Sequence, residues 1–329
     1  MKILITGATG YVGNKLALTL AERDNDVNVL VRNPDSVNVP VHKNIKIYTG
    51  DITYKQSITA AITDCEQVYH IAALVKFFSK DPSLFNRINV EGTRNLLEKS
   101  VEMGVRKFVF TSSCGVLGTS IDKPRCEDDP RLTPFENDYE FTKFLAEKLV
   151  REYNAKGLDT VIVSPSKVYG PGIETHPFSV NRIINKFIKG RLTFIPKPGN
   201  LSTNYCFIDD VVEGHILAMN NGVSGEKYIL GGENISFVDL FNIIRLLSGT
   251  KARLIQTPRI FVQTWALMQW IQYKITDKEP FTTSKGIRQI FCNKTFSSEK
   301  AILQLGYHPT PLKDALQQTI HFLKTQDHV

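Results

Sequence analysis

The sequence is poor in cysteine and contains no long apolar run. Its 329 residues include five scattered cysteines, with no Cys-x-x-Cys pair among them: Cys65, Cys114, Cys126, Cys206 and Cys292. This usage predicts reduced thiols and disfavours a structural zinc site. No apolar segment approaches the roughly 20 residues that span a bilayer, and a strand begins directly after Met1 and Lys2, so no signal peptide is expected. We therefore expect a soluble, cytoplasmic protein without a metal ion.

Acidic residues are absent from two segments, 175–208 and 240–276, and both carry several lysines and arginines within a net charge of +7. Such segments attract anionic substrates, cofactor phosphates or anionic surfaces. In the first segment, however, Arg182, Lys186 and Lys189 share one side of an apolar helical pattern, which favours a solvated helix face. No nucleic-acid recognition motif is present, so nucleic acid is not an expected partner.

A glycine-rich turn at the start of the chain is the strongest positive signal. Lys2–Ile5 predicts a buried strand, glycines recur at every third position, and helical spacing begins at Tyr11. A strand, glycine turn and helix start hold a pyrophosphate, because the backbone can approach it and the helix N-terminus offers unpaired N–H groups. The turn residues expected at a dinucleotide are Gly7, Thr9, Gly10, Tyr11, Val12 and Gly13.

Strands and helices then alternate. Apolar runs predict strands at 27–31, 45–48, 67–70, 107–110 and 160–163, and one long helix is expected from Pro82 to Met103. This order predicts an α/β fold, a Rossmann-type doubly wound parallel sheet. Ligands bind beyond the carboxyl ends of such strands, so one cleft is expected to be faced by Gly7, Arg32, Asp51, His70 and Ser113.

Two residues at these strand ends bear on the cofactor. Arg32 follows the second strand, where an enzyme that uses NAD often has an acid, and its positive charge suits a 2′-phosphate. The sequence thus favours NADP over NAD, and the alternative interpretation of Arg32 is a surface arginine on a loop. Asp51 is placed either to accept from the adenine amino group or to cap the helix that begins near Tyr54.

A second lobe is expected after the turn Tyr169–Gly172. We predict a cofactor domain from residues 1–170 and about 204–232, and a smaller, mostly helical substrate-binding lobe from about 171–203 and 233–329. The polar segment 118–137 is predicted to be a loop able to cover the cleft. The bulky helix 260–275 suits a substrate-pocket wall, a subunit contact or an interfacial membrane helix, but packing of the second lobe is favoured, because Trp and Met at helical spacing are more often core.

Ser113, Tyr139 and Lys143 form the predicted catalytic group. Tyr139 and Lys143 lie one helical turn apart, and Ser113 ends a strand. A lysine ammonium at ~4 Å would lower the pKa of a tyrosine by about three units. Tyr139 would then exchange a proton with a carbonyl or alcohol oxygen that Ser113 holds, while hydride moves to or from a nicotinamide. Serine hydrolase chemistry is disfavoured, because no Gly-x-Ser-x-Gly surrounds Ser113.

The chain resembles the extended short-chain dehydrogenases/reductases of the NAD-dependent epimerase/dehydratase superfamily. Within them it is similar to the dihydroflavonol-reductase-like branch, which includes proteins labelled hopanoid-associated sugar epimerases. The segments that carry the resemblance are Thr6–Gly13, Gly50–Ile52, His70–Ala73, Asn89–Thr93, Thr111–Ser113, Tyr139–Lys143, Tyr169–Gly172 and Ile208–Val211, with Val31–Pro34 and Tyr228–Asn234 for the branch.

The resemblance implies that Asp51 and Ile52 contact adenine and that Ala72 and Ala73 line the cofactor. It implies a triad of Ser113, Tyr139 and Lys143, with Tyr139 and Lys143 also at the cofactor, and a possible homodimer. Pro165 and Val168 are further candidates for cofactor binding.

Val116-Leu117-Gly118 replaces the Val-Tyr-Gly usual in sugar-nucleotide epimerases, and Asn204–Phe207 lacks their arginine. These departures favour an NADP(H)-dependent oxidoreductase acting on a ketone, aldehyde or alcohol of a small, moderately apolar molecule. The alternatives are an NAD-dependent nucleotide-sugar epimerase and a non-catalytic protein that senses the cofactor.

Overall fold

A parallel sheet of seven strands dominates the computed structural model, which describes residues 1–76, 78–175, 179–276, 280 and 287–326. Its strand order is β10-β6-β5-β4-β1-β2-β3, and every neighbouring pair is parallel. The strands are β1 (Lys2–Thr6), β2 (Asp26–Val31), β3 (Ile45–Thr49), β4 (Gln67–His70), β5 (Lys107–Thr111), β6 (Asp159–Pro165) and β10 (Lys227–Leu230). All the strands predicted between residues 2 and 163 are confirmed, within one or two residues at each end.

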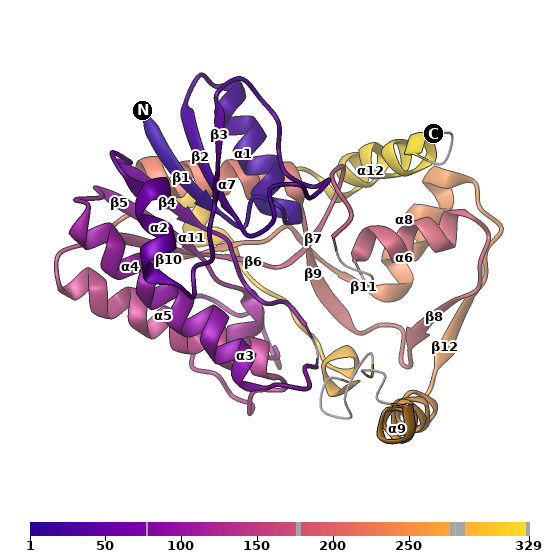
Figure 1. Ribbon diagram of the computed structural model, residues 1–329. Coiled ribbons are helices and arrows are strands. Elements are labelled where there is room, and N and C mark those ends of the chain that lie inside the picture. Colours follow the sequence, from indigo (N-terminus) through magenta and orange to yellow (C-terminus); the bar gives the residue numbers. More distant parts are fainter. Residues whose placement is uncertain (77, 176–178, 277–279, 281–286, 327–329) are drawn as a thin grey trace.

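Helices cover both faces of this sheet (Figure 1). One face packs against α1 (Tyr11–Glu22), α7 (Ile208–Asn221) and α11 (Glu299–Leu305). The other packs against α2 (Lys55–Ile62), α4 (Gly92–Glu102) and α5 (Asp138–Ala155). Because both faces are covered, the central strands are mostly apolar and buried, as expected for a parallel sheet, whereas the edge strand β3 is partly exposed. The structure is thus the Rossmann-type doubly wound fold that the sequence predicts.

The chain reverses direction within the sheet between β1 and β4. From β1 it proceeds through β2 to β3, and from β4 it proceeds the other way through β5 and β6 to β10. The loops after β1 and β4 therefore diverge and leave a crevice at the carboxyl edge, which is where doubly wound sheets bind ligands.

The helix predicted from Pro82 to Met103 is interrupted. It consists of α3 (Ser83–Asn86), a π-helical turn over Arg87–Glu91 and then α4. A π-turn inserts an extra residue and rotates the side chains that follow it.

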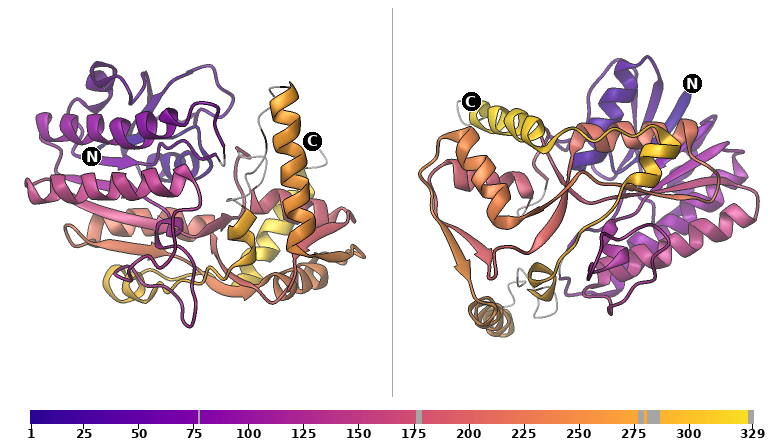
Figure 2. Two further views of the ribbon diagram at one scale, coloured as in Figure 1. Left: turned by 90° about the horizontal axis from the view of Figure 1, so that it is seen from below. Right: turned by 180° about the vertical axis from the view of Figure 1, so that it is seen from behind.

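A second group of elements lies beside the sheet (Figures 1 and 2). It has its own apolar core, built from α6 (Val180–Ile188), α8 (Phe237–Ser248) and α12 (Leu312–Gln326), with α9 (Arg259–Thr276) at its margin. Two small sheets accompany these helices, β7 (Lys167–Tyr169) with β9 (Ser202–Phe207) and β11 (Glu233–Ser236), and β8 (Thr193–Pro196) with β12 (Leu254–Thr257). On α6, Arg182, Lys186 and Lys189 are exposed while Ile184 and Phe187 are buried, as the solvated-face interpretation requires.

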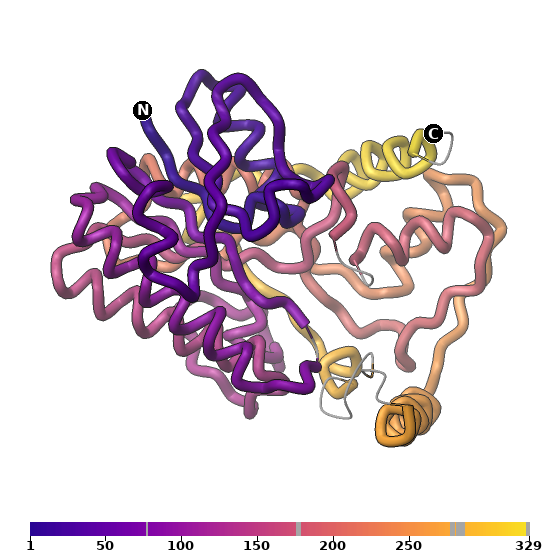
Figure 3. The backbone as a smooth tube through the Cα atoms, viewed as in Figure 1, coloured from indigo at the N-terminus to yellow at the C-terminus, as the bar shows by residue number. Residues whose placement is uncertain are grey.

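Each of the two groups combines segments from distant parts of the chain. The strand β9 belongs to the three-stranded sheet and lies outside the large sheet. In addition, α11 lies within 233–329 but packs against α7 and β10 on the large sheet. The tube in Figure 3 shows the chain passing back and forth between the two groups. The burial of apolar surface, and not the position along the chain, determines which elements belong to each group.

Candidate active site

A cleft of about 580 Å³ opens at the carboxyl edge of the large sheet. It runs from the end of β2 past the ends of β1 and β4 to the end of β5 and the start of α5. Fifteen of the sixteen site residues predicted from the sequence line it, which are Gly7, Thr9, Gly10, Tyr11, Val12, Arg32, Asp51, Ile52, Ala72, Ala73, Ser113, Tyr139, Lys143, Pro165 and Val168. The fold therefore gathers residues that are up to about 160 positions apart in the chain.

The turn after β1 has no room for a side chain at Gly7. Gly7 has φ +81°, and a Cβ there would lie 2.6 Å from the backbone nitrogen of Ala72. The Gly10 N–H donates to the Gly7 carbonyl at 2.9 Å and closes the turn. The first turn of α1 has no acidic residue and no side-chain cap, so its N–H groups and partial positive charge are available to a pyrophosphate. The residues present fit a dinucleotide.

Gly13 is the predicted site residue that does not line the cleft. A Cβ at Gly13 would lie 2.2 Å from the Gly7 carbonyl oxygen and 2.7 Å from the Gly7 carbonyl carbon. Gly13 thus lets α1 pack directly against the turn, and its contribution to the site is to hold Gly7 in place.

Tyr11 connects the glycine turn to the second group of elements. Its hydroxyl donates to the Gly170 carbonyl at 2.6 Å, and Asn181 Nδ2 donates both to that hydroxyl at 3.3 Å and to the same carbonyl at 2.7 Å. Burial raises the pKa of Tyr11 well above its ordinary value, so the hydroxyl stays neutral. This contact fixes the position of the Tyr169–Gly172 turn against the cleft.

The far end of the cleft is formed by Arg32 and Asp51. Arg32 is exposed and lines the cleft directly after β2. Asp51 Oδ1 accepts hydrogen bonds from the backbone N–H and the hydroxyl of Thr53, at 2.8 and 2.9 Å. The helix α2 begins at Lys55 without a side-chain cap. Asp51 therefore stabilises the turn before α2, and it is not the helix cap that the sequence allowed.

Ser113, Tyr139 and Lys143 lie together at the other end of the cleft. Ser113 follows β5, and Tyr139 and Lys143 lie in the first turns of α5, where Asn137 Oδ1 caps the helix by accepting from the Glu140 N–H at 2.7 Å. A hydrogen bond joins the side chains of Ser113 and Tyr139. Lys143 is 1% exposed, and its Nζ lies 3.9 Å from the centroid of the Phe110 ring.

The pKa of Tyr139 differs from the sequence-based expectation. Burial raises it to about 12, against the opposing effect of the Ser113 hydrogen bond, and Lys143 is not among the groups that shift it. Burial also lowers the pKa of Lys143 to about 7, although the Glu147 carboxylate acts in the opposite direction. Desolvation penalises the charged form of each group. In this structure Tyr139 is thus a neutral phenol, and Lys143 titrates near neutrality.

His70 does not face the cleft, contrary to the sequence-based expectation. It is fully buried, with Nδ1 2.7 Å from Thr6 Oγ1 and Nε2 2.9 Å from Thr93 Oγ1. Burial, reinforced by Lys143, lowers its pKa to about 3. His70 is a neutral core residue that ties β4 to β1 and α4.

Asn89 is a positioning residue that the sequence analysis did not select. It lies in the π-helical turn, where its Oδ1 accepts from the Leu74 N–H at 2.7 Å and its Nδ2 donates to Thr142 Oγ1 at 3.0 Å. Leu74 lines the cleft, and Thr142 precedes Lys143. Asn89 therefore joins the loop after β4 to α5, the helix that carries Tyr139 and Lys143, and the sequence signal was its occurrence in the Asn89–Thr93 motif.

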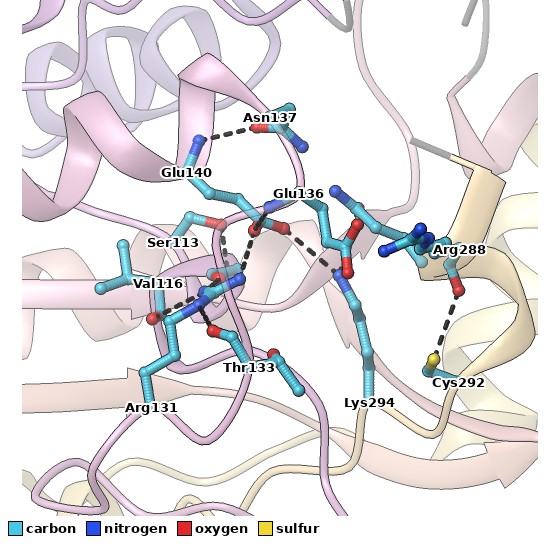
Figure 4. Close-up of polar contacts among 12 residues, drawn as sticks. Ser113, Val116, Arg131, Thr133, Glu136, Asn137, Glu140, Arg288, Cys292 and Lys294 are labelled. Atoms are coloured by element: carbon cyan, nitrogen blue, oxygen red, sulfur yellow. Dashed lines mark hydrogen bonds and ion pairs between the residues drawn. The ribbon is translucent and has the colours of Figure 1, made fainter. Parts of the chain in front are cut away.

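A charged network holds the start of α5 in place (Figure 4). Glu140, which is 2% exposed and adjacent to Tyr139, lies 2.8 Å from Arg131 Nη2 and 3.3 Å from Lys294 Nζ. Arg131 Nη1 donates to the carbonyls of Gly115 and Val116, at 2.6 and 2.9 Å. The segment 118–137, predicted to be able to cover the cleft, does not line it. Arg131 instead anchors this segment to the turn after Ser113.

A second, smaller pocket of about 190 Å³ adjoins the catalytic end of the cleft, and Ser113 and Tyr139 line both spaces. One wall is apolar, with Val75, Pro165 and Phe296. Lys167 and Lys294 also contribute to the lining, and burial together with the Lys294 charge lowers the pKa of Lys167 to about 8. The pocket thus has a polar side as well as an apolar wall.

Three further expectations concern metal ligands, cysteine thiols and membrane-spanning helices. Among the residues that the structure describes, no three His, Cys, Asp or Glu side chains gather as metal ligands. All five cysteines are unpaired thiols. Within the same ranges, no helix combines the length and the apolar character needed to cross a bilayer.

Curated proteins similar along almost the whole chain include several redox enzymes. "Sterol demethylase protein B" of Methylococcus capsulatus is 30% identical, with 98% of each chain covered. A protein of Synechocystis sp. that bears the provisional name dihydroflavonol 4-reductase is 29% identical, over 99% of this chain and 95% of its own. The 3-beta-hydroxysteroid dehydrogenase of Mycolicibacterium neoaurum is 27% identical, over 94% and 87%.

Solved structures share the fold. The crystal structure of gox2253 is 32% identical, covers 98% of each chain and superposes with a TM-score of 0.82. The UDP-glucose 4-epimerase of Thermotoga maritima, solved with UDP-glucose, has the same TM-score at 22% identity over 99% of both chains, and this likeness concerns the fold alone. The model of the NAD dependent epimerase/dehydratase family matches residues 3–231. The chain therefore belongs to the NAD-dependent epimerase/dehydratase family, whose members bind a nicotinamide nucleotide.

Proposed function

We propose that this protein is an NADP(H)-dependent oxidoreductase that reduces a ketone or aldehyde of a small molecule, or oxidises the alcohol, with Tyr139 as the acid/base. One observation carries the proposal: Ser113 and Tyr139 line both the long cleft and the small pocket, with Lys143 beside them in the cleft. A cofactor in the cleft and a substrate in the pocket would therefore meet at these side chains.

Each side chain has a distinct role in the proposed reduction. Tyr139 is protonated, because burial raises its pKa to about 12, and it can donate to a carbonyl oxygen as negative charge develops there. Ser113 already bonds the Tyr139 hydroxyl, and it is placed to hold the same substrate oxygen. Lys143 adds positive charge when protonated, which stabilises the phenolate that proton donation leaves. The nicotinamide, when bound, supplies or accepts the hydride.

The small pocket supports a compact substrate. Its volume of about 190 Å³ is below the roughly 300–1,000 Å³ of sites that take drug-sized ligands, so it favours a small molecule over a nucleotide sugar. The apolar wall suits a hydrocarbon part of the substrate, and the lysines suit a hydrogen-bond acceptor at its other end. The proposed substrate is therefore apolar on one side and polar on the other.

The preference for NADP rests on Arg32. It is the charged residue of the cleft lining directly after β2, and no acid occupies that position. A guanidinium binds a phosphate through charge-assisted hydrogen bonds. The cytoplasmic location and the homodimer stay predictions.

Replacing Tyr139 tests the catalytic proposal. In Tyr139→Phe we expect kcat/KM for carbonyl reduction to fall by about 10²–10⁴, because the proton donor is lost, while the affinity for NADP⁺ stays within a factor of two. Consumption of NADPH is followed by absorbance across a panel of ketones and aldehydes. Tyr54→Phe, at a tyrosine that is 70% exposed, is the control. Unchanged activity in Tyr139→Phe would overturn the assignment, and a cofactor that co-purifies without being consumed would favour the epimerase.

Calorimetric titration tests the cofactor preference. Loss of a hydrogen bond to a charged group costs about 1.5–3 kcal/mol, so Arg32→Ala should weaken NADP⁺ binding roughly 10- to 150-fold and leave NAD⁺ binding unchanged. Arg106→Ala is the matched control, since this exposed arginine precedes β5 at the opposite edge of the sheet. Equal affinity of the unmodified protein for the two cofactors would refute the preference.

A further inference from the structure

The helix α9 presents most of its apolar side chains to solvent. Of its 18 residues only Ala266 is buried, so the predicted packing within the second lobe is wrong. Large apolar side chains of this helix are between 44% and 78% exposed, namely Ile260, Phe261, Trp265, Leu267, Met268, Trp270, Ile271 and Ile275. Figure 1 shows α9 nearly end-on at the margin of the molecule, and Figure 2 shows it lengthwise at the edge. Contiguous apolar surface of this kind marks an interaction site.

The exposed side chains form one stripe. At about 100° per residue, seven of them fall within a continuous arc of about 160°, namely Ile260, Phe261, Trp265, Leu267, Met268, Ile271 and Ile275. The buried Ala266 and the half-buried Tyr273 lie on the opposite side of the helix. Tyr273 faces the body of the protein, where its ring centroid is 5.3 Å from that of Phe78. With a rise of about 1.5 Å per residue, the stripe from Ile260 to Ile275 is about 24 Å long.

The charged residues of α9 itself are both positive. No acidic residue occurs between 240 and 276, and Arg259 and Lys274 stand at the two ends of the helix. The strand β12 leads into α9 (Figure 1) and adds further exposed apolar surface. Its Ile255 is the register partner of Phe194 on one face of the β8–β12 sheet, and the two side chains are 37% and 67% exposed. Arg191 and Arg253, near this pair in the chain, are exposed as well.

We propose that α9 is an interfacial helix that docks this protein on an anionic lipid bilayer, with the apolar stripe inserted below the headgroups and the helix axis parallel to the membrane plane. The composition is that of interfacial helices, which bury Trp, Phe and Leu and keep Lys and Arg at the polar boundary. Both tryptophans also suit the headgroup region.

A second copy of the chain fits this surface less well. In a two-fold dimer with antiparallel α9 helices, the Arg259 end of each copy would lie near the Lys274 end of the other. Like charges at such an interface oppose association, and α9 itself has no acid to compensate them; the next acids in the sequence are Asp277 and Glu279. Anionic headgroups would instead neutralise these positive charges.

The position of α9 links the membrane to the candidate active site. Tyr273 contacts Phe78, and Lys80 Nζ lies 6.0 Å from the centroid of the Tyr273 ring. This segment follows Val75 and Lys76, which line the small pocket. A docked protein would thus hold the pocket close to substrates dissolved in the bilayer. This last step rests on the proposed function, whereas membrane docking does not.

Tryptophan fluorescence tests the proposal directly, because the only two tryptophans of the sequence, Trp265 and Trp270, are both on α9. The full-length protein is mixed with vesicles of equal parts phosphatidylglycerol and phosphatidylcholine, and with vesicles of phosphatidylcholine alone. We expect co-sedimentation with the anionic vesicles, a blue shift of the emission and quenching by brominated acyl chains. Binding to the neutral vesicles should be at least tenfold weaker.

Variants distinguish membrane binding through the stripe from general effects of added surface charge. Leu267→Asp combined with Met268→Asp should lower the partition coefficient at least tenfold and abolish the blue shift. Leu303→Asp on α11, where the side chain is 76% exposed, is the matched control and should bind like the unmodified protein. NADP⁺ affinity verifies that each variant is folded and tests the proposed function separately.

Two results would overturn the proposal. The first is an unchanged emission spectrum together with no co-sedimentation on anionic vesicles. The second is a blue shift that appears without vesicles and rises with protein concentration in parallel with dimerisation, which would assign the stripe to a second copy.

Discussion

Glu147 is the anionic partner of a buried lysine close to Ser112, the residue before the proposed catalytic serine Ser113. Its Oε1 lies 2.7 Å from Lys227 Nζ, and the two side chains are 8% and 3% exposed. The same carboxylate accepts a hydrogen bond from Ser112 Oγ at 2.5 Å. The pair thus joins α5, which carries Tyr139 and Lys143, to β10 and to the loop after β5.

We predict that Glu147→Gln destabilises the protein strongly. The substitution keeps an acceptor for Ser112 but leaves Lys227 buried without a counter-ion, and removing one partner of a buried pair costs about 3–5 kcal/mol. Glu152 in the same helix provides a matched control, because it lies 2.7 Å from Lys156 with side chains that are 51% and 55% exposed. For an exposed pair about 0.2–1 kcal/mol is expected, so Glu152→Gln should have a small effect.

Urea unfolding followed by circular dichroism measures the loss of unfolding free energy in each variant. An unchanged slope of the unfolding free energy against urea concentration verifies that the two-state comparison is valid. The double variant Glu147→Leu/Lys227→Met should recover most of the stability lost in Glu147→Gln, since both members of the buried pair are removed together. Equal losses in Glu147→Gln and Glu152→Gln would refute the reasoning, because the two pairs have the same length and differ in burial.

Two further predictions concern the glycine turn and a buried histidine. Gly13→Ala should weaken dinucleotide binding at least tenfold in calorimetry, because its Cβ would meet the Gly7 carbonyl oxygen at 2.2 Å and displace the turn; affinity equal to that of the unmodified protein would contradict this role. Burial lowers the pKa of His215 to about 4, so between pH 6.5 and 4 the unfolded chain takes up a proton that the folded protein does not, and stability falls on acidification by up to about 1.4 kcal/mol per pH unit. His215→Gln should reduce the loss of unfolding free energy between pH 7 and 5, and an identical loss in variant and unmodified protein would show that His215 is not responsible.

Much of the cofactor cleft could be predicted from the sequence, because parallel strands bring their carboxyl ends to one edge. Gly7, Arg32, Asp51 and Ser113 each follow an apolar run, and all of them line the cleft. His70 follows such a run too, but its ring turns inward to Thr6 and Thr93. Periodicity locates the end of a strand, whereas the direction of a side chain depends on the hydrogen-bond partners that the fold provides.

The electrostatics of the site depended on packing. A Tyr-x-x-x-Lys spacing predicted a lysine that lowers the pKa of Tyr139, but in the structure Lys143 lies over the Phe110 ring, and burial raises the Tyr139 pKa to about 12. Glu140, Arg131 and Lys294 form their network across more than 150 residues of sequence, so no local pattern indicates it.

The sequence by itself determined the order of strands and helices, the nucleotide-binding turn and the identity of the catalytic candidates, since these depend on local periodicity and on glycine at positions without room for a side chain. The tertiary structure decided which apolar surfaces are buried. Trp265 and Met268 have the helical spacing of core residues, yet they are 44% and 66% exposed on α9. Spacing shows that a helix has an apolar face, but only the arrangement of the other elements determines whether the protein itself covers it.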